Sequence, residues 1–260
     1  MLRGMLVPVL PALLAAACAF PVEGDFAGRR LDAGLNPAKT IVIIHNHGFS
    51  SATAGTYQPV IPPILKLAAD RNPDVVVFSQ VRNTSRLAGV DHSAYIESAI
   101  AHFHRERGVP LENIILAGQS CGGWGSLQAA AFTYPTLGGV VGFAPTCHGK
   151  LPHSTEVRIR REQEIAQLAD RIRTAGTIFL YEGDSYYTLA EWDAFEARVN
   201  SRAPELRVER VSRARVLELC ARCATDSHGA YWDGRFAAAF FESHVQALVE
   251  RVRARIRASP

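Results

Sequence analysis

The chain of 260 residues is 48% hydrophobic and 20% charged, with a formal net charge of +3 at pH 7. This composition excludes a disordered, collagen-like or low-complexity chain, because enough apolar surface is present to build a core. The basic residues form no stripe interleaved with aromatic residues, so nucleic acid is not an expected partner.

Residues 1–19 have the pattern of a secretory signal peptide. Arg3 gives a basic start, residues 6–14 are apolar, and Ala17-Cys18-Ala19 fits a small-residue cleavage site before Phe20. A transmembrane helix needs about 20 apolar residues, so no transmembrane segment is expected. A bacterial lipoprotein signal, with a lipid anchor at Cys18, is the alternative. We therefore expect an exported protein that is periplasmic or extracellular.

From residue 20 onward, strand and helix patterns alternate. Short β-branched and apolar runs predict buried parallel strands at 40–44, 75–81, 113–117, 139–144, 177–181 and 206–211. Amphipathic or Ala-rich segments predict helices at 57–70, 92–107, 122–134, 156–174, 190–200 and 233–256. The alternation predicts one α/β domain over 20–260, with a mostly parallel central sheet and helices on both faces. In such sheets, ligands bind beyond the carboxyl ends of the strands.

The strand at 113–117 is followed by Gly118-Gln119-Ser120-Cys121-Gly122. A G-x-S-x-G pattern between a strand and a helix is typical of a nucleophile elbow. The glycines leave room for a sharp turn with strained backbone angles, and the helix N-terminus favours developing negative charge. We therefore expect Ser120 to be a nucleophile.

The strand at 40–44 is followed by His45-Asn46-His47-Gly48-Phe49. A His-Gly pair at this position fits half of an oxyanion hole, whose donors would be the backbone N–H groups of Phe49 and Cys121. Gly48 would let the backbone approach the substrate. The side chains of His45 and His47 are expected to pack or form hydrogen bonds without a catalytic part.

Two later loops supply candidates for an acid and a base. Asp184 follows a glycine just after the strand at 177–181, and Glu182 is its rival as the acid. A loop expected over 212–227 leads to His228, which lies beside a glycine and is the candidate general base. His244 lies within a predicted helix and is poorly placed for that role.

The chain order Ser120, Asp184, His228 resembles that of the α/β-hydrolase superfamily. The resemblance extends from His47 to the last helix, and the size resembles that of small secreted esterases and dienelactone-hydrolase-like members. It implies an α/β-hydrolase fold without a large cap, because only 32 residues lie between Ala144 and Thr177. It also implies an acyl-enzyme mechanism on carboxylic esters of small molecules or polymers, with no metal and no cofactor.

Four cysteines remain after the signal segment, and four cysteines allow three pairings. Export favours disulfides, and we expect Cys121–Cys147 and Cys220–Cys223. The resemblance implies the first pairing, since these cysteines would follow neighbouring strands. Cys220-x-x-Cys223 would suit a zinc or redox site, but further zinc ligands are not evident.

Five further residues are candidates for a substrate pocket: His47, Gly48, His148, Tyr186 and Trp232. A peptidase or thioesterase of the same fold is an alternative function, and so is a non-catalytic binding protein on a hydrolase scaffold. A redox protein using Cys220 and Cys223 is a third class, which would require an exposed, reactive thiol.

Overall fold

The computed structural model describes residues 22–31, 34–49, 58–82 and 94–258. The expected signal segment, including Cys18, therefore lies outside the described residues. Seven strands form one sheet in the order β1-β3-β2-β4-β5-β6-β7, in which only β1 runs antiparallel to its neighbour. Their bounds are β1 Gly24–Ala27, β2 Ile41–Asn46, β3 Val75–Gln80, β4 Ile114–Gln119, β5 Gly139–Phe143, β6 Gly176–Tyr181 and β7 Leu206–Val211.

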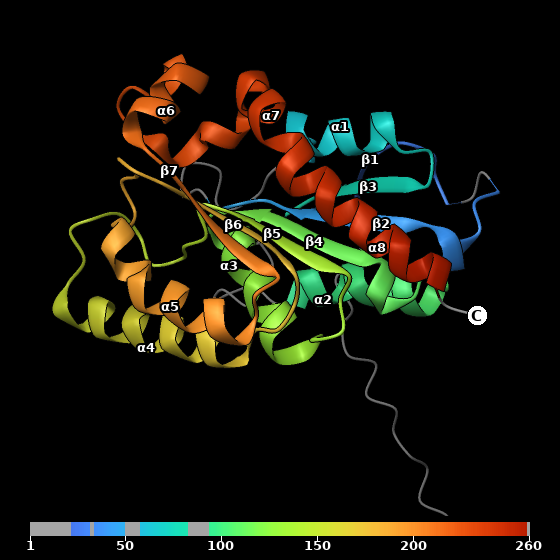
Figure 1. Ribbon diagram of the computed structural model, residues 1–260, viewed down its shortest axis with the longest axis horizontal. Helices are drawn as coiled ribbons and strands as arrows, with labels where there is room; N and C mark the ends of the chain where they lie inside the picture. The colour runs from blue at the N-terminus through green and yellow to red at the C-terminus, as the bar shows by residue number, and fades with distance from the viewer. Residues whose placement is uncertain (1–21, 32–33, 50–57, 83–93, 259–260) are drawn as a thin grey trace, which may run out of the picture.

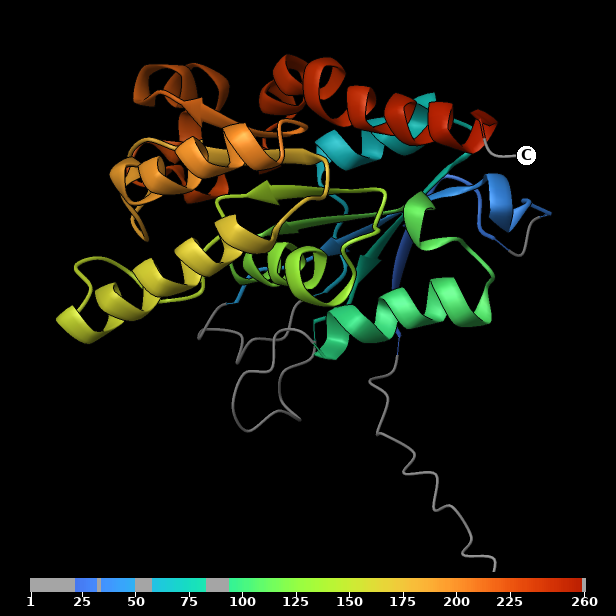
Figure 2. The same cartoon turned by 60° about the horizontal axis from the view of Figure 1, so that its bottom comes forward.

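Helices cover both faces of this sheet (Figure 1). On one face lie α1 Pro63–Arg71, α7 Gly234–Phe240 and α8 Ala247–Ala258; on the other lie α2 Ala94–Ala101, α3 Cys121–Gln128 and α4 Thr155–Arg171, with α5 Asp193–Arg202 beside α4 (Figure 2). The prediction of a mostly parallel sheet between two helical layers is confirmed. Strands β2 to β6 are buried along their whole length, as expected for parallel strands covered on both faces.

The predicted strands all form, but two elements were missed. Strand β1 has only four residues, and pairing with β3 rather than a strong local pattern makes it a strand. The segment 212–227, expected to be a loop, contains helix α6 Arg213–Leu219 and a single 3-10 turn at Ala221–Cys223. The Ser212 hydroxyl accepts a hydrogen bond from the Arg215 N–H and so caps α6.

Three helices are continued by one turn of π-helix, at His102–Glu106, Ala129–Thr133 and Phe241–Gln246. The last of these joins α7 to α8, where the sequence predicted one continuous helix over 233–256. Between β5 and β6, the chain forms a single helix, α4. This connection therefore holds no large cap, as expected from its length.

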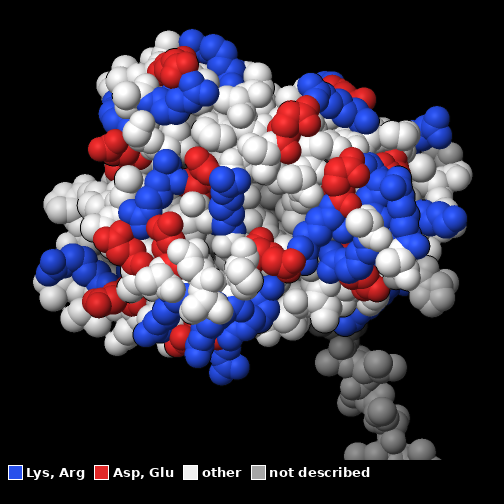
Figure 3. All heavy atoms as spheres, in the orientation of Figure 1, with Lys and Arg blue, Asp and Glu red and all other residues white. Residues whose placement is uncertain are grey.

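The surface mixes the two signs of charge. On the face in Figure 3, basic and acidic side chains lie interspersed. Many are paired: Arg198 and Arg202 both contact Asp170, and Arg253 contacts Asp74. The two exposed pairs with Asp170 each contribute little to stability, about 0 to 1 kcal/mol.

Candidate active site

Ser120 lies at the sharp turn between β4 and α3. Its backbone angles are φ 55° and ψ −125°, a region that non-glycine residues rarely adopt. Its N–H donates to the Phe143 carbonyl at 3.0 Å, and its carbonyl accepts from the Trp124 N–H at 2.8 Å. These bonds tie the turn to β5 and to the first turn of α3. Together they offset the energetic cost of the strained backbone conformation. The sequence-predicted elbow geometry is present.

The glycines of the turn are required by close backbone packing. A Cβ atom at Gly118 would overlap the Gly122 carbonyl, and one at Gly122 would overlap the carbonyl oxygens of Asn46 and His47. Only hydrogen fits at either position. The end of β2 therefore packs directly against the start of α3.

Gly48 lies against the nucleophile. A Cβ atom there would come within 2.9 Å of the Ser120 Cβ and 2.5 Å of the Gln119 Oε1. The segment that carries the expected donor Phe49 is thereby brought beside the turn that carries the expected donor Cys121. The Phe49 side chain is 41% exposed, and the Arg82 guanidinium lies 5.5 Å from the centre of its ring.

His45 and His47 are buried in a hydrogen-bonded cluster. The ring nitrogens His45 Nδ1 and His47 Nε2 lie 3.0 and 3.1 Å from the Ser79 hydroxyl, which also donates to the Val60 carbonyl. Burial and the neighbouring Arg82 charge lower the pKa of His47 to about 4, and burial and His47 lower the pKa of His45. Both rings are therefore neutral near pH 7. The Trp232 ring stacks on His47 at 6.1 Å, so these two pocket candidates are neighbours.

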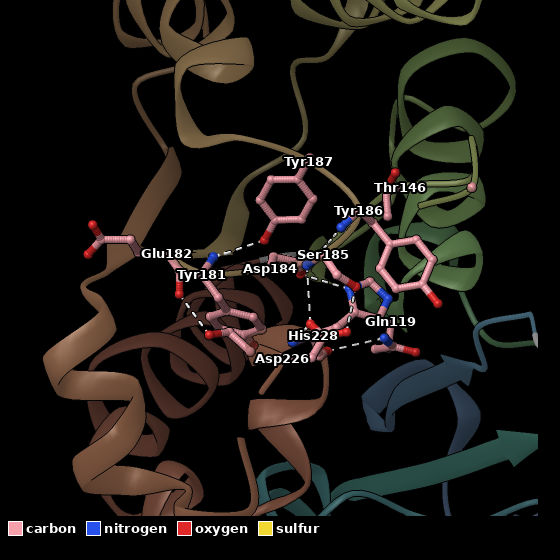
Figure 4. A network of polar contacts seen from close by, with 12 residues as sticks. Gln119, Thr146, Tyr181, Glu182, Asp184, Ser185, Tyr186, Tyr187, Asp226 and His228 are labelled. Carbon is pink, nitrogen blue, oxygen red and sulfur yellow. Dashed lines mark hydrogen bonds and ion pairs between the residues drawn. The ribbon is translucent and has the colours of Figure 1, made fainter. Parts of the chain in front are cut away.

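Asp184 lies in the loop after β6, and His228 lies in a 3-10 helix, Ser227–Trp232, at the end of the loop that follows α6. Asp184 Oδ2 accepts from His228 Nδ1 at 2.7 Å, and Asp184 Oδ1 accepts from the Tyr186 N–H at 2.8 Å (Figure 4). The His228 Nε2 atom is buried and has no hydrogen-bond partner among the described residues. The rival acid Glu182 points away from the imidazole in Figure 4, and its carboxylate accepts from the Arg213 N–H instead.

Sequence reasoning missed two polar residues at this site. The Gln119 side chain, one residue before the nucleophile, donates to the His228 carbonyl at 3.3 Å, and so joins the elbow to the segment of the candidate base. Asp226 accepts from the His228 N–H at 3.0 Å. For Gln119, its position inside the G-x-S-x-G pattern was the only sequence feature that could have indicated a place at the site. For Asp226, the only such feature was its residue type, which can cap a turn, two positions before His228.

The remaining pocket candidates divide into two groups. Tyr186 packs against His228, with ring centres 4.2 Å apart, and Lys150 Nζ lies 5.4 Å from the centre of the Tyr186 ring. His148 is instead buried beside α4, where its Nε2 lies 2.8 Å from Glu164 and its Nδ1 lies 3.2 Å from Arg161. Burial, reinforced by Arg161, lowers the pKa of His148 despite its contact with Glu164.

Both expected disulfides are present in the structure. Cys121 and Cys147 are bonded with their Cα atoms 4.4 Å apart, which links the residue after Ser120 to the loop after β5. Cys220 and Cys223 are bonded across the end of α6, and both are almost fully buried. A buried disulfide lacks the exposed thiol that the redox alternative required.

The described residues lack two features, a metal site and a membrane-spanning helix. No group of three or more His, Cys, Asp or Glu side chains in them is arranged to hold a metal ion. None of the helices they form is long and apolar enough to cross a membrane.

Comparisons with known proteins find similarity in structure alone. No protein-family model and no curated protein sequence matches the chain. Among solved structures, it is similar to the monoacylglycerol lipase of Paleococcus ferrophilus (TM-score 0.55, 11% identity, covering 89% of this chain and all of that one). It is also similar to esterase PE8, with a TM-score of 0.54 and 14% identity, covering 86% of this chain and 100% of that one. A third similar structure is the Pyrococcus furiosus esterase Pf2001, with a TM-score of 0.53 and 11% identity, covering 89% of this chain and 93% of that one. At these identities, the likeness shows a shared fold.

Proposed function

We propose that this chain, which has the α/β-hydrolase fold, is a serine hydrolase that cleaves carboxylic esters through an acyl-enzyme on Ser120. The observation that carries the proposal is the hydrogen bond between Asp184 and His228. It leaves His228 Nε2 buried without a hydrogen-bond partner in the part of the chain that the structure describes, in a segment that Gln119 joins to the turn of Ser120. An acid, a base and a strained serine arranged in this way support nucleophilic catalysis.

The proposed reaction begins with a proton transfer. His228 Nε2 takes the proton of the Ser120 hydroxyl while Asp184 holds the imidazole in the tautomer with its proton on Nδ1 and stabilises the imidazolium that forms. The Ser120 oxygen attacks the ester carbonyl, and the backbone N–H groups of Phe49 and Cys121 stabilise the tetrahedral oxyanion. The imidazolium then donates its proton to the leaving alcohol, and His228 activates a water molecule that hydrolyses the acyl-enzyme.

Esters are the first substrates to test because the structural neighbours include enzymes named as esterases and a lipase. Gly48, His47, Tyr186 and Trp232 are proposed to border the acyl or alcohol group. We assign His148 a more distant place beside α4, because its ring is engaged by Glu164 and Arg161.

Export is part of the proposal. The pattern of residues 1–19 supports it, with plain secretion or a lipid anchor at Cys18, and residues 20–260 would then form the single mature domain. Two disulfides accord with an oxidising compartment.

The test is labelling with a fluorophosphonate serine probe, alongside hydrolysis of p-nitrophenyl acetate and butyrate. We expect Ser120→Ala to abolish both labelling and turnover with an unchanged circular dichroism spectrum. Ser201→Ala, which removes an exposed hydroxyl on α5, is the matched control and should keep both. Folded wild-type protein that neither reacts with the probe nor hydrolyses esters would overturn the proposal.

A further inference from the structure

A second carboxylate lies behind the proposed acid and base. Asp226 Oδ1 accepts from the Ser185 N–H at 3.2 Å and from the His228 N–H at 3.0 Å, and its Oδ2 accepts from the Ser185 hydroxyl at 2.5 Å (Figure 4). One carboxylate thus contacts the residue after Asp184 and the backbone of the candidate base itself.

The neighbouring residue strengthens the same connection. The Ser227 N–H donates to the Gly183 carbonyl at 3.1 Å, and the Ser227 hydroxyl donates to the Glu182 carbonyl at 2.7 Å. Arg213 Nη1, from the first turn of α6, donates to the Ser227 hydroxyl at 2.6 Å and to the Cys223 carbonyl at 3.0 Å. Hydrogen bonds between these two segments therefore lie on both sides of Asp184.

These hydrogen bonds lie on either side of the contact between Asp184 and His228, which the proposed chemistry needs. Asp184 lies between Gly183 and Ser185, which are both bonded to the loop of the base, and His228 follows directly after Ser227. If the bonds to Asp226 were lost, the loop of Asp184 could shift relative to the imidazole by the few tenths of an ångström to 1 Å that misalign a proton transfer.

We propose that Asp226 is a positioning residue, which sets the distance and angle between Asp184 and His228 by accepting hydrogen bonds from both loops and does not itself exchange a proton with substrate. The inference rests on the proposed function, because it concerns the same acid and base. It extends that function by assigning a role to a residue outside the Ser120, Asp184 and His228 set.

The ionisation of Asp226 fits this role. Burial by itself would raise its pKa, but hydrogen bonds from the Ser185 hydroxyl and from the N–H groups of His228 and Ser185 outweigh burial and lower it. The group is therefore an anionic acceptor at neutral pH. Its negative charge near His228 is an alternative way to influence catalysis, so the experiment must separate charge from position.

Two substitutions of one residue make this separation. In Asp226→Asn the charge is lost, but Oδ1 still accepts from the two N–H groups and the amide can donate to the Ser185 oxygen. In Asp226→Ala both charge and acceptors are lost. We expect Asp226→Ala to lower kcat about 30-fold with KM changed less than twofold, and Asp226→Asn to recover kcat to within about threefold of wild type.

Turnover is to be measured per active site counted by fluorophosphonate titration, so that a fraction of unfolded protein does not lower kcat. Asp233→Ala is the matched control, since Asp233 also accepts hydrogen bonds from a following segment but caps α7 instead of joining the two loops. It should leave kcat within twofold of wild type.

Three outcomes decide the proposal. An Asp226→Ala enzyme with wild-type kcat overturns it, and an Asp226→Asn enzyme as slow as Asp226→Ala overturns it in favour of charge. If Asp226→Ala does not fold, Ser185→Ala removes the hydroxyl bond alone and should lower kcat about threefold at constant KM; wild-type kcat would again overturn the proposal. Failure of the proposed function appears separately, as wild-type protein that the probe does not label.

Discussion

Around Ser120, backbone packs directly against backbone, whereas around Asp184 and His228 side chains bridge two loops that are far apart in sequence. The elbow has no space for a Cβ atom at Gly118 or Gly122, so its shape follows from excluded volume. The proposed acid and base are 44 residues apart, and their segments are joined by hydrogen bonds that side chains such as Asp226 accept.

This contrast predicts which substitutions would disrupt the turn of Ser120 and which would disrupt the pair of Asp184 and His228. The turn at Ser120 tolerates almost no added volume at its glycines, and its hydrogen bonds with Phe143 and Trp124 join main-chain groups, which do not depend on the side chain at either position. An acid–base pair held by hydrogen bonds tolerates small changes in volume, but it loses its geometry when an acceptor is removed. The proposed enzyme therefore combines a turn that is fixed by packing between nearby residues with an acid–base pair that hydrogen bonds hold between distant segments.

The largest effect is expected on the acid–base side, from Asp184→Asn. An amide can donate to His228 Nδ1 and favour the tautomer that carries its proton on Nε2, which cannot accept the serine proton. We expect kcat to fall about 10³- to 10⁴-fold with little change in stability, measured by p-nitrophenyl butyrate turnover and thermal unfolding.

Glu182→Gln is the control for this substitution, because its carboxylate contacts the Arg213 N–H and not His228. Turnover should remain within about threefold of wild type. If Glu182→Gln were the slower enzyme, the acid would be misassigned.

At the turn of Ser120, the substitution Gly122→Ala is expected to lower the stability of the folded protein. The added methyl group would overlap the carbonyl oxygens of Asn46 and His47, which belong to the main chain and cannot rotate away. We expect a loss of more than about 3 kcal/mol in the free energy of unfolding, measured in urea, or a collapse of the soluble yield.

Gly234→Ala, at the start of α7, is the matched substitution, since an added Cβ there meets no atom within 4 Å. It should change stability by less than about 0.5 kcal/mol. Equal stability of the two variants would show that the elbow relaxes more readily than its packing indicates.

The smallest difference is expected between removal of one disulfide and removal of the other. Cys121–Cys147 spans 26 residues and Cys220–Cys223 spans 3, so the chain-entropy model gives losses of about 3.5 and about 1.6 kcal/mol on removal. We expect the double substitution Cys121→Ser with Cys147→Ser to destabilise more than Cys220→Ser with Cys223→Ser in urea unfolding. The reverse order would mean that packing around α6, and not loop closure, dominates.

Much of the fold could be predicted from local pattern. The runs predicted at 40–44 and 113–117 are apolar from their second residue onward and rich in Ile, and both belong to buried central strands. Strand β1 and helix α6 could not be predicted in the same way. The first becomes a strand by pairing with β3, and the second is a helix of only seven residues, three of them charged, with Val216 and Leu219 buried.

The amino-acid sequence alone determined the alternating α/β architecture and the elbow at Ser120, because hydrophobic periodicity and glycine spacing act over a few neighbouring residues. Only the tertiary structure decided that Asp184 and not Glu182 contacts His228, and that Gln119 and Asp226 join the loops around the site. The physical reason is range: a hydrogen bond between residues 44 positions apart depends on how every intervening strand and helix packs, and no local pattern carries that information.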